Sequence, residues 1–175
     1  MRRSLAGMAN NMSSQGITYR VGIEEQCGEE LISQIAEIER NTFSDAWSED
    51  SITDTLKQDY NMVVVAFQDN SDADLEQQIV CKGYLLASKI AGESELLRIA
   101  VDASCRGCGI GRMLMERYID NLRQDCDRSI LEVREGNIAA RSLYEQFGYQ
   151  NISVRKNYYR DPSEDGVIYE CVLRQ

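Results

Sequence analysis

The chain has 175 residues, of which 43% are hydrophobic and 27% charged, a composition typical of one water-soluble globular domain with a sizeable core. Its net charge of −10, from 29 acidic and 19 basic residues, argues against direct binding to nucleic acid, which requires clustered Lys and Arg. No apolar run approaches the roughly 20 residues that span a bilayer, so we expect no membrane partner.

The first 15 residues begin with Arg2 and Arg3 but contain no continuous apolar segment, unlike a secretory signal peptide. We therefore expect a flexible tail over residues 1–15, one domain over residues 16–175 and a cytoplasmic location. The acidic surface suits a cationic substrate such as an amine, although acidity also serves solubility alone.

Hydrophobic periodicity and turn residues predict the order of the secondary-structure elements. The expected elements are a strand at 17–23, helices at 29–43 and 48–57, strands at 62–67, 78–90 and 95–101, a helix from 110 to 123, a strand at 129–133, a helix from 137 to 147, and strands at 149–155 and 167–173. Ser48 and Asn137 are suited to cap the second and fourth helices. This order predicts one α/β domain with a mixed sheet covered by helices.

The six cysteines are scattered along the chain rather than arranged as a disulfide framework, so we expect free thiols in a reducing compartment. Cys105 and Cys108 form half of a zinc or redox motif, but no second pair follows and the chain has no histidine. We expect no metal site. Without histidine, acid–base chemistry must come from Glu, Asp, Tyr, Cys or Lys, and the Ser-His and Cys-His nucleophile pairs are excluded.

A glycine-rich turn lies between the strand that ends at Val101 and the helix that follows. Its glycines let the backbone N–H groups turn inward, and the helix N-terminus adds unpaired donors and partial positive charge, so the turn is suited to bind a phosphate or pyrophosphate. An ordinary strand-to-helix turn is the alternative. A Walker A loop is excluded because Arg112 and Met113 follow Gly111. A dinucleotide fingerprint fits poorly because the glycine spacing is wrong and about a hundred residues precede the turn.

The turn resembles the coenzyme A pyrophosphate loop of the GNAT acetyltransferases, whose pattern is R/Q-x-x-G-x-G/A. Three further segments resemble the family in the same order: Leu131-Glu132-Val133-Arg134, Asn137-x-x-Ala140-x-x-Leu143-Tyr144 and Phe147-Gly148-Tyr149. Residues 97–159 are similar to the ribosomal-protein-alanine N-acetyltransferases, which acetylate a protein N-terminus. The resemblance implies a mostly antiparallel sheet, helices on both faces and a splayed strand pair at the cofactor site. Asp45 and Ala46 depart from the subgroup, in which proline commonly precedes the tryptophan.

The resemblance also implies roles for particular residues. Glu132 is expected as the general base and Tyr144 as the general acid that protonates the coenzyme A sulfur. Acetyl-coenzyme A is expected to contact Ile99, Ala100, Val101, Arg106, Gly107, Cys108, Gly109, Ile110, Gly111, Arg112, Asn137 and Tyr144. The acceptor peptide is expected to contact Trp47, Glu49, Tyr158 and Tyr159. The simpler interpretations are a surface Glu132, a core Tyr144 and loop tyrosines that pack on the sheet.

The predicted activity is acetylation of a protein N-terminal α-amine, with the N-terminal alanine of ribosomal protein S18 as the expected acceptor and a monomer or weak dimer as the expected state. Because an α-amino group titrates near pH ~8, a carboxylate base is adequate, and transfer is expected to be direct. Alternatives are acetylation of a lysine, polyamine or antibiotic amine, a non-catalytic coenzyme A-binding module, and a nucleotide-binding module.

Overall fold

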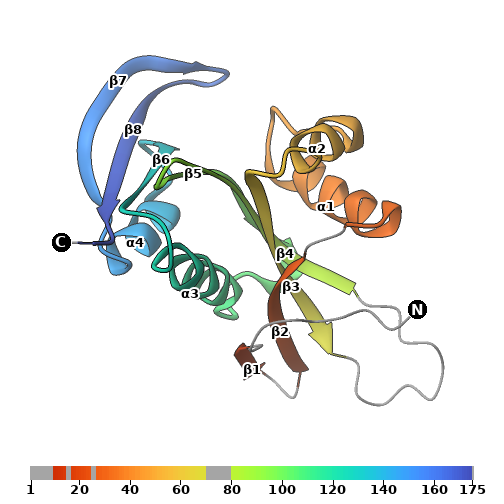
Figure 1. Ribbon diagram of the computed structural model, residues 1–175. Helices are drawn as coiled ribbons and strands as arrows, with labels where there is room; N and C mark the ends of the chain where they lie inside the picture. Colours follow the sequence, from red (N-terminus) through yellow and green to blue (C-terminus); the bar gives the residue numbers. More distant parts are fainter. Residues whose placement is uncertain (1–9, 15–16, 25–26, 70–79, 175) are drawn as a thin grey trace, which may run out of the picture.

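The computed structural model describes residues 10–14, 17–24, 27–69 and 80–174, and in these ranges eight strands form one sheet in the order β1-β2-β3-β4-β5-β6-β8-β7 (Figure 1). The strands are β1 (Asn10–Ser14), β2 (Ile17–Glu24), β3 (Asn61–Asp69), β4 (Val80–Ile90), β5 (Glu93–Val101), β6 (Arg128–Arg134), β7 (Gln150–Arg160) and β8 (Ser163–Val172). The helices are α1 (Glu29–Thr42), α2 (Glu49–Leu56), α3 (Ile110–Leu122) and α4 (Ile138–Gln146), with a short 3₁₀ turn at Ala103–Cys105.

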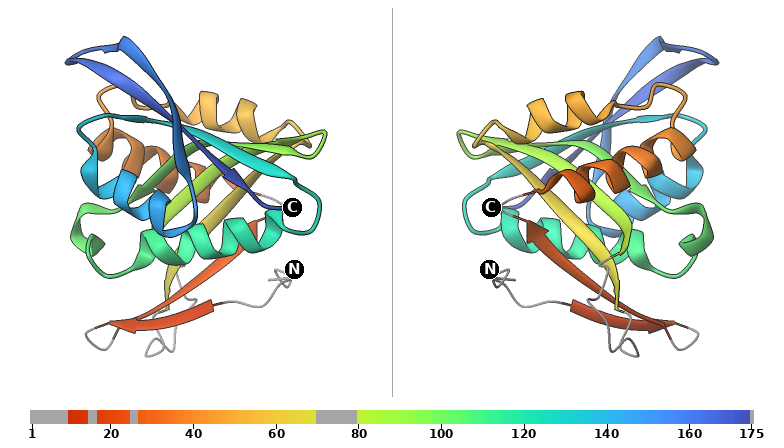
Figure 2. Two further views of the ribbon diagram at one scale, coloured as in Figure 1. Left: turned by 90° about the vertical axis from the view of Figure 1, so that its left-hand side faces the viewer. Right: turned by 90° about the vertical axis from the view of Figure 1, so that its right-hand side faces the viewer.

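Helices cover both faces of the sheet, as predicted (Figure 2). One hydrophobic cluster joins α1 and α2 to β3 and β4, and includes Ile35, Ile52 and Val65. A second cluster joins α3 and α4 to the opposite face, and includes Leu114, Leu131 and Tyr144. No helix in the described part of the chain is long and apolar enough to cross a membrane.

All strand pairs are antiparallel except β5 and β6, which are parallel and are linked by α3. The pairing of β5 with β6 begins at Glu93 with Arg128 and ends at Leu96 with Leu131. On its other side β5 remains paired with β4 up to Val101. The last residues of β5 therefore leave β6 while they stay attached to β4, which is the splayed pair that the resemblance implies.

Two predicted helix caps are confirmed. The Ser48 hydroxyl accepts a hydrogen bond from the Ser51 N–H at 3.1 Å, and the Asn137 carboxamide oxygen accepts one from the Ala140 N–H at 3.1 Å. Each bond satisfies a donor in the first turn of a helix that would otherwise lack a partner.

The structure corrects the sequence analysis at the last two strands: β7 continues past Arg155 to Arg160, and β8 begins at Ser163, four residues earlier than expected. The pairing of β7 with β8 is irregular between Arg155 and Tyr159, where Asn157 adopts a φ of 52°. The carboxylate of Asp165 on β8 accepts the Asn157 N–H at 2.8 Å, and this bond holds the two strands together across the irregularity. Pairing then resumes from Tyr159 to the turn after Arg160.

Two other predicted segments lie largely outside the described residues. Of the expected tail over residues 1–15, only Asn10–Ser14 is described, and it forms β1 at the sheet edge, paired with β2. The turn expected over residues 68–74 begins later, because Gln68 and Asp69 belong to β3, and its remaining residues lie within 70–79, which the structure does not describe.

Candidate active site

The candidate site begins where β5 and β6 stop pairing. The register between β4 and β5 shifts there, since Ala87 lies opposite Leu96 and Leu86 lies opposite Arg98. Leu97 is thus an extra residue on β5, a β-bulge, and a bulge bends its strand and disrupts the adjacent ladder. The divergence of β5 from β6 starts at the residue before this bulge.

Beyond the bulge, backbone groups of β5 face away from β4. The Asp102 N–H donates to the Lys82 carbonyl on β4 at 3.0 Å. Because successive residues of a strand direct their backbone groups to opposite sides, Ala100 faces β4 and both Ile99 and Val101 face the side that β6 has left. Of the three residues of this segment that were expected to contact acetyl-coenzyme A, Ile99 and Val101 therefore direct their backbone groups to the open side, and Ala100 does not.

The glycine-rich turn follows directly. Gly107 and Gly109 adopt φ angles of 78° and 81°, in the left-handed region that residues with a Cβ atom rarely occupy. Gly109 is the N-cap of α3 and its carbonyl accepts the Met113 N–H at 3.1 Å. Five backbone N–H groups at this turn donate to no acceptor among the described residues. They belong to Gly107, Gly109, Ile110, Gly111 and Arg112. The turn therefore presents donors suited to an anion at the N-terminus of a 13-residue helix.

Three side chains surround this turn. Gly111 lies beside Leu143 of α4, and an added Cβ would be in ordinary contact with the Leu143 Cδ2, at 3.4 Å. Arg112 bonds to Glu116 at 2.9 Å and to Gln146 of α4 at 3.3 Å. Arg106 instead folds back, and its guanidinium lies 3.4 Å from both the Val101 carbonyl and the Thr42 hydroxyl. The backbone, more than the Arg106 side chain, makes this turn an anion site.

Tyr144 projects from α4 into the core cluster and is only 4% exposed. Its ring centroid lies 6.0 Å from that of Tyr149, and its hydroxyl has no hydrogen-bond partner among the described residues. Burial raises the pKa of Tyr144, and Tyr159 adds a smaller contribution in the same direction. The phenol therefore stays protonated well into the alkaline range, and its proton remains free for another acceptor.

Glu132 is the first residue of β6 after the pairing with β5 ends. Leu131 and Val133 are buried on the α3 and α4 side, so Glu132 faces the opposite side of the strand. Its carboxylate lies 3.0 Å from the Arg155 guanidinium on β7, and its side chain is 21% exposed. The Arg155 side chain is 55% exposed, so solvent screens this ion pair. The structure thus places a carboxylate, accessible to water, at the divergence of the two strands.

Tyr158 and Tyr159 lie near the turn of the β7–β8 hairpin, which curves toward α1 and α2 (Figures 1 and 2). Their rings meet edge to face with centroids 5.1 Å apart. The Arg134 guanidinium lies 4.1 Å from the centre of the Tyr159 ring. Burial, and next the charge of Glu132, raises the pKa of Tyr159 to about 12. Tyr159 is therefore within electrostatic range of both Glu132 and Tyr144.

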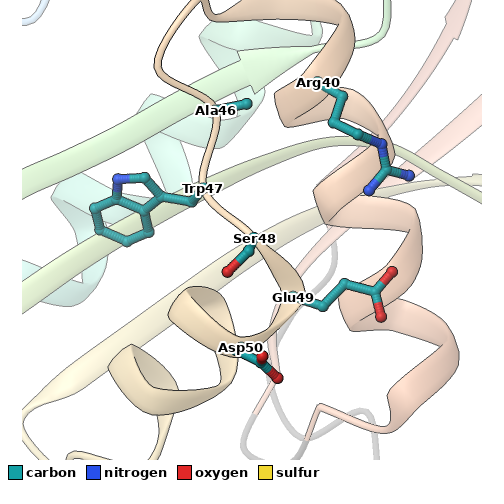
Figure 3. Close-up of a pocket in the computed structure, with 6 residues that line it drawn as sticks. All are labelled: Arg40, Ala46, Trp47, Ser48, Glu49 and Asp50. Atoms are coloured by element: carbon teal, nitrogen blue, oxygen red, sulfur yellow. The ribbon is translucent and has the colours of Figure 1, made fainter.

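Trp47 and Glu49 point in opposite directions from the segment that joins α1 to α2 (Figure 3). The Trp47 ring lies over the sheet, 5.2 Å from the Arg98 guanidinium. Glu49 points toward α1, where it accepts the Ser33 hydroxyl at 3.0 Å. Both residues border a shallow hollow of about 510 Å³, together with Arg40, Ala46, Ser48 and Asp50. The structure brings Trp47, but not Glu49, toward the strands that carry the site.

The sequence analysis missed the arginines of this region. Arg98, Arg134 and Arg155 pair with Asp45, Glu164 and Glu132 respectively. Arg98 could have been found, because it interrupts an apolar strand as Glu132 does. Within the described residues, no cluster of three or more His, Cys, Asp or Glu could hold a metal ion.

Comparison with known proteins gives consistent matches. Residues 32–149 match the family described as "Acetyltransferase (GNAT) family". The [ribosomal protein bS18]-alanine N-acetyltransferase of Haemophilus influenzae is 37% identical over 95 residues, which cover 52% of this chain and 64% of that protein, just under two thirds. A putative enzyme of the same name from Bacillus subtilis is 31% identical over 83% of this chain and 92% of that protein. The crystal structure of the ribosomal-protein-S18-alanine N-acetyltransferase from Escherichia coli superposes with a TM-score of 0.74 at 25% identity, covering 89% of this chain and 95% of that one.

The positive φ of Gly109 predicts the effect of adding a Cβ atom. Gly109→Ala is expected to destabilise the protein by about 1–2 kcal/mol, because a left-handed backbone is strained for alanine. Chemical denaturation followed by circular dichroism measures the change. Gly22→Ala is the matched control, since its Cβ would meet no atom within 4 Å and its φ is not positive. Equal stabilities for the two variants would contradict the assigned backbone conformation.

Proposed function

The chain belongs to the acetyltransferase (GNAT) family and is an acyltransferase, and from that premise we propose that it transfers an acetyl group from acetyl-coenzyme A to the α-amine of a protein N-terminus. The proposed acceptor is the N-terminal alanine of ribosomal protein S18, the protein that the names of its relatives specify. We also propose that residues 16–175 form one acetyltransferase domain.

One observation carries the proposal. The pairing of β5 with β6 ends at Leu131, so the Glu132 carboxylate, which is partly open to solvent, stands where the two strands diverge. The unpaired amides of the glycine-rich turn follow β5 at the same end of the sheet. Glu132 stands between the buried residues Leu131 and Val133, and its ion pair with Arg155, which is 55% exposed, contributes little stabilisation, so the carboxylate is available to a substrate.

The residues present fit acetyl-coenzyme A. The five unpaired amides of the glycine-rich turn would hold the pyrophosphate. The outward backbone groups of Ile99 and the Val101 N–H would pair with the pantetheine arm, and the Val101 carbonyl would do so once Arg106 releases it. Asn137 remains a proposed contact for the same arm, in addition to its role as a helix cap. When bound, the cosubstrate supplies an acetyl thioester, which an amine can attack.

Two side chains would then move the protons. Glu132 would accept a proton from the acceptor amine, directly or through a water molecule, since an α-amine with a pKa near ~8 needs only a weak base. The Tyr144 hydroxyl would donate its proton to the departing sulfur, since burial keeps that hydroxyl protonated. With no nucleophile required, transfer would occur in one ternary complex.

A panel of three acceptors tests the proposed function. The purified chain is expected to release free thiol from acetyl-coenzyme A rapidly with a peptide that begins with the Ala of S18. At least tenfold slower release is expected with an N-blocked lysine peptide and with spermidine, because neither offers an α-amine at a chain terminus. A preference for the lysine peptide or for spermidine would show that the acceptor is not a protein α-amine. The absence of turnover with all three acceptors would contradict the proposed activity.

Replacing the base tests the mechanism. Glu132→Gln is expected to lower kcat about a hundredfold with little change in the Kd of acetyl-coenzyme A, because the amide cannot accept the proton. Steady-state kinetics and calorimetry measure the two quantities. Glu170→Gln is the matched control: Glu170 lies on the adjacent strand β8, and its side chain is 24% exposed and paired with Arg128. An unchanged kcat in Glu132→Gln would remove this residue from the mechanism.

The pH profile tests Tyr144. Because the raised pKa of Tyr144 keeps it protonated, kcat/KM is expected to rise with pH through the titration of the acceptor amine near pH ~8 and to stay level up to pH ~9.5. Tyr144→Phe should lower kcat at every pH in that range. A fall in wild-type activity below pH ~9, absent in Tyr144→Phe, would show that the phenol loses its proton earlier than its burial implies.

A further inference from the structure

The segment that joins α1 to α2, residues 43–48, is here named the α1–α2 loop. Two side chains with little solvent exposure, Glu39 and Arg98, hold it against the sheet. It begins at Phe43, after α1, and ends at Ser48, which caps α2. Its middle residues include Asp45 and Trp47, and Asp45 is within electrostatic range of both Arg134 and Tyr159. The loop therefore faces the β7–β8 hairpin across the candidate site.

The first tie is Glu39, whose side chain is completely buried. One carboxylate oxygen accepts the Trp47 backbone N–H at 3.0 Å, and the other accepts the hydroxyl of Tyr84, a fully buried residue of β4. The Glu39 backbone carbonyl also accepts the Phe43 N–H at 2.9 Å. One residue of α1 thus binds the loop at both ends and links it to the sheet.

The second tie is Arg98 of β5, whose side chain is 15% exposed. Its guanidinium lies 4.7 Å from the centre of the Phe43 ring and 5.2 Å from that of Trp47. It also bonds to both carboxylate oxygens of Asp45, at 3.4 and 3.0 Å, and to the Asp45 carbonyl at 3.2 Å. Burial raises the pKa of Tyr84, and the positive charge of Arg98 acts in the opposite direction. The Arg98 charge therefore lies near the Glu39–Tyr84 pair.

Burying the Glu39 carboxylate costs more free energy than a purely structural loop would require. A buried carboxylate loses its hydration, and an apolar residue of similar size commonly stabilises such a site as well or better. Arg98 stands next to Ile99, whose backbone faces the proposed thioester site. Arg98 therefore contacts the loop through its side chain, and through its backbone it belongs to β5, the strand proposed to bind acetyl-coenzyme A.

We propose that Glu39 and Arg98 are positioning residues that hold the α1–α2 loop as one wall of the acceptor site, so that they set the KM for the acceptor peptide and leave the KM for acetyl-coenzyme A unchanged. This inference rests on the proposed function for its kinetic part. Its structural part, the position of the loop, can be measured without turnover.

Trp47 makes the loop directly observable, because it is the one tryptophan of the chain. Glu39 accepts a hydrogen bond from the backbone N–H of Trp47. Glu39→Met, which removes the acceptor at similar volume, is expected to increase acrylamide quenching of Trp47 fluorescence at least twofold. Glu39→Gln retains a carbonyl oxygen for the Trp47 N–H and should recover most of the wild-type value. Arg98→Met should increase quenching as well, and Arg98→Lys should restore it only partly, because a lysine lacks the planar fork.

Arg128→Met is the matched control for Arg98→Met. Arg128 also lies in a central strand and pairs with two carboxylates, those of Glu93 and Glu170, but it contacts no residue of the loop. Circular dichroism establishes that each variant is folded at the assay temperature. In the kinetic arm, Arg98→Met and Glu39→Met are expected to raise the acceptor KM about tenfold, with the acetyl-coenzyme A KM within twofold of the wild type.

The outcomes separate the two proposals. Unchanged quenching in folded Glu39→Met and Arg98→Met, or equal increases in both KM values, would overturn the positioning role. If the wild-type chain acetylates no peptide amine, the proposed function fails, while the quenching measurements still decide whether Glu39 and Arg98 hold the loop.

Discussion

The extra residue in β5 is the constraint on which the rest of the site depends. With Leu97 unpaired, the strand bends where its ladder with β6 ends, and the backbone groups of Ile99 and Val101 face away from β4 without a strand to receive them. Such groups need a partner: the Val101 carbonyl lies 3.4 Å from the Arg106 guanidinium, and the other groups are left to solvent or a ligand. Pairing with β4 continues up to Val101, so the exposed backbone is held rigidly in place.

The parallel pairing of β5 with β6 explains why the chemical groups meet at one end of the sheet. A parallel pair requires a crossover helix, and α3 provides it, so the carboxyl ends of β5 and β6 point the same way. The glycine-rich turn leaves β5 at that end, and Glu132 follows the last paired residue of β6 there. Leu143, the residue before Tyr144 on α4, packs against Gly111. This contact links the Tyr144 phenol to the start of α3. An anion at the turn is therefore placed at a fixed distance from both side chains.

The sequence predicted most of this arrangement for identifiable reasons. Glu132 was identified through the resemblance of its strand segment to the family, and the turn because its glycines stand between a strand and an amphipathic helix. Arg98 belongs to none of the motifs that carry the resemblance, and its partner Asp45 is 53 residues away in the chain, a separation that no local pattern encodes. The full length of β7 was missed because its residues are almost all exposed, so that the alternation of buried and exposed positions that marks a strand is absent. The Leu97 bulge could not be predicted, because it is a property of the register between two strands.

In the β7–β8 hairpin, one glycine allows the aromatic pair and the ion pair with Glu132 to form. Gly166 of β8 lies opposite both Arg134 and Arg155, between the strand that carries Glu132 and the edge strand. A Cβ at Gly166 would come within 3.2–3.3 Å of the Tyr158 side chain, a distance tighter than ordinary contact. The glycine therefore lets Tyr158 pack flat on β8, and Tyr158 in turn supports both the Tyr159 ring and the Arg155 guanidinium. Since Arg155 must cross β8 to reach Glu132, a larger residue at position 166 would displace the aromatic pair and the ion pair together.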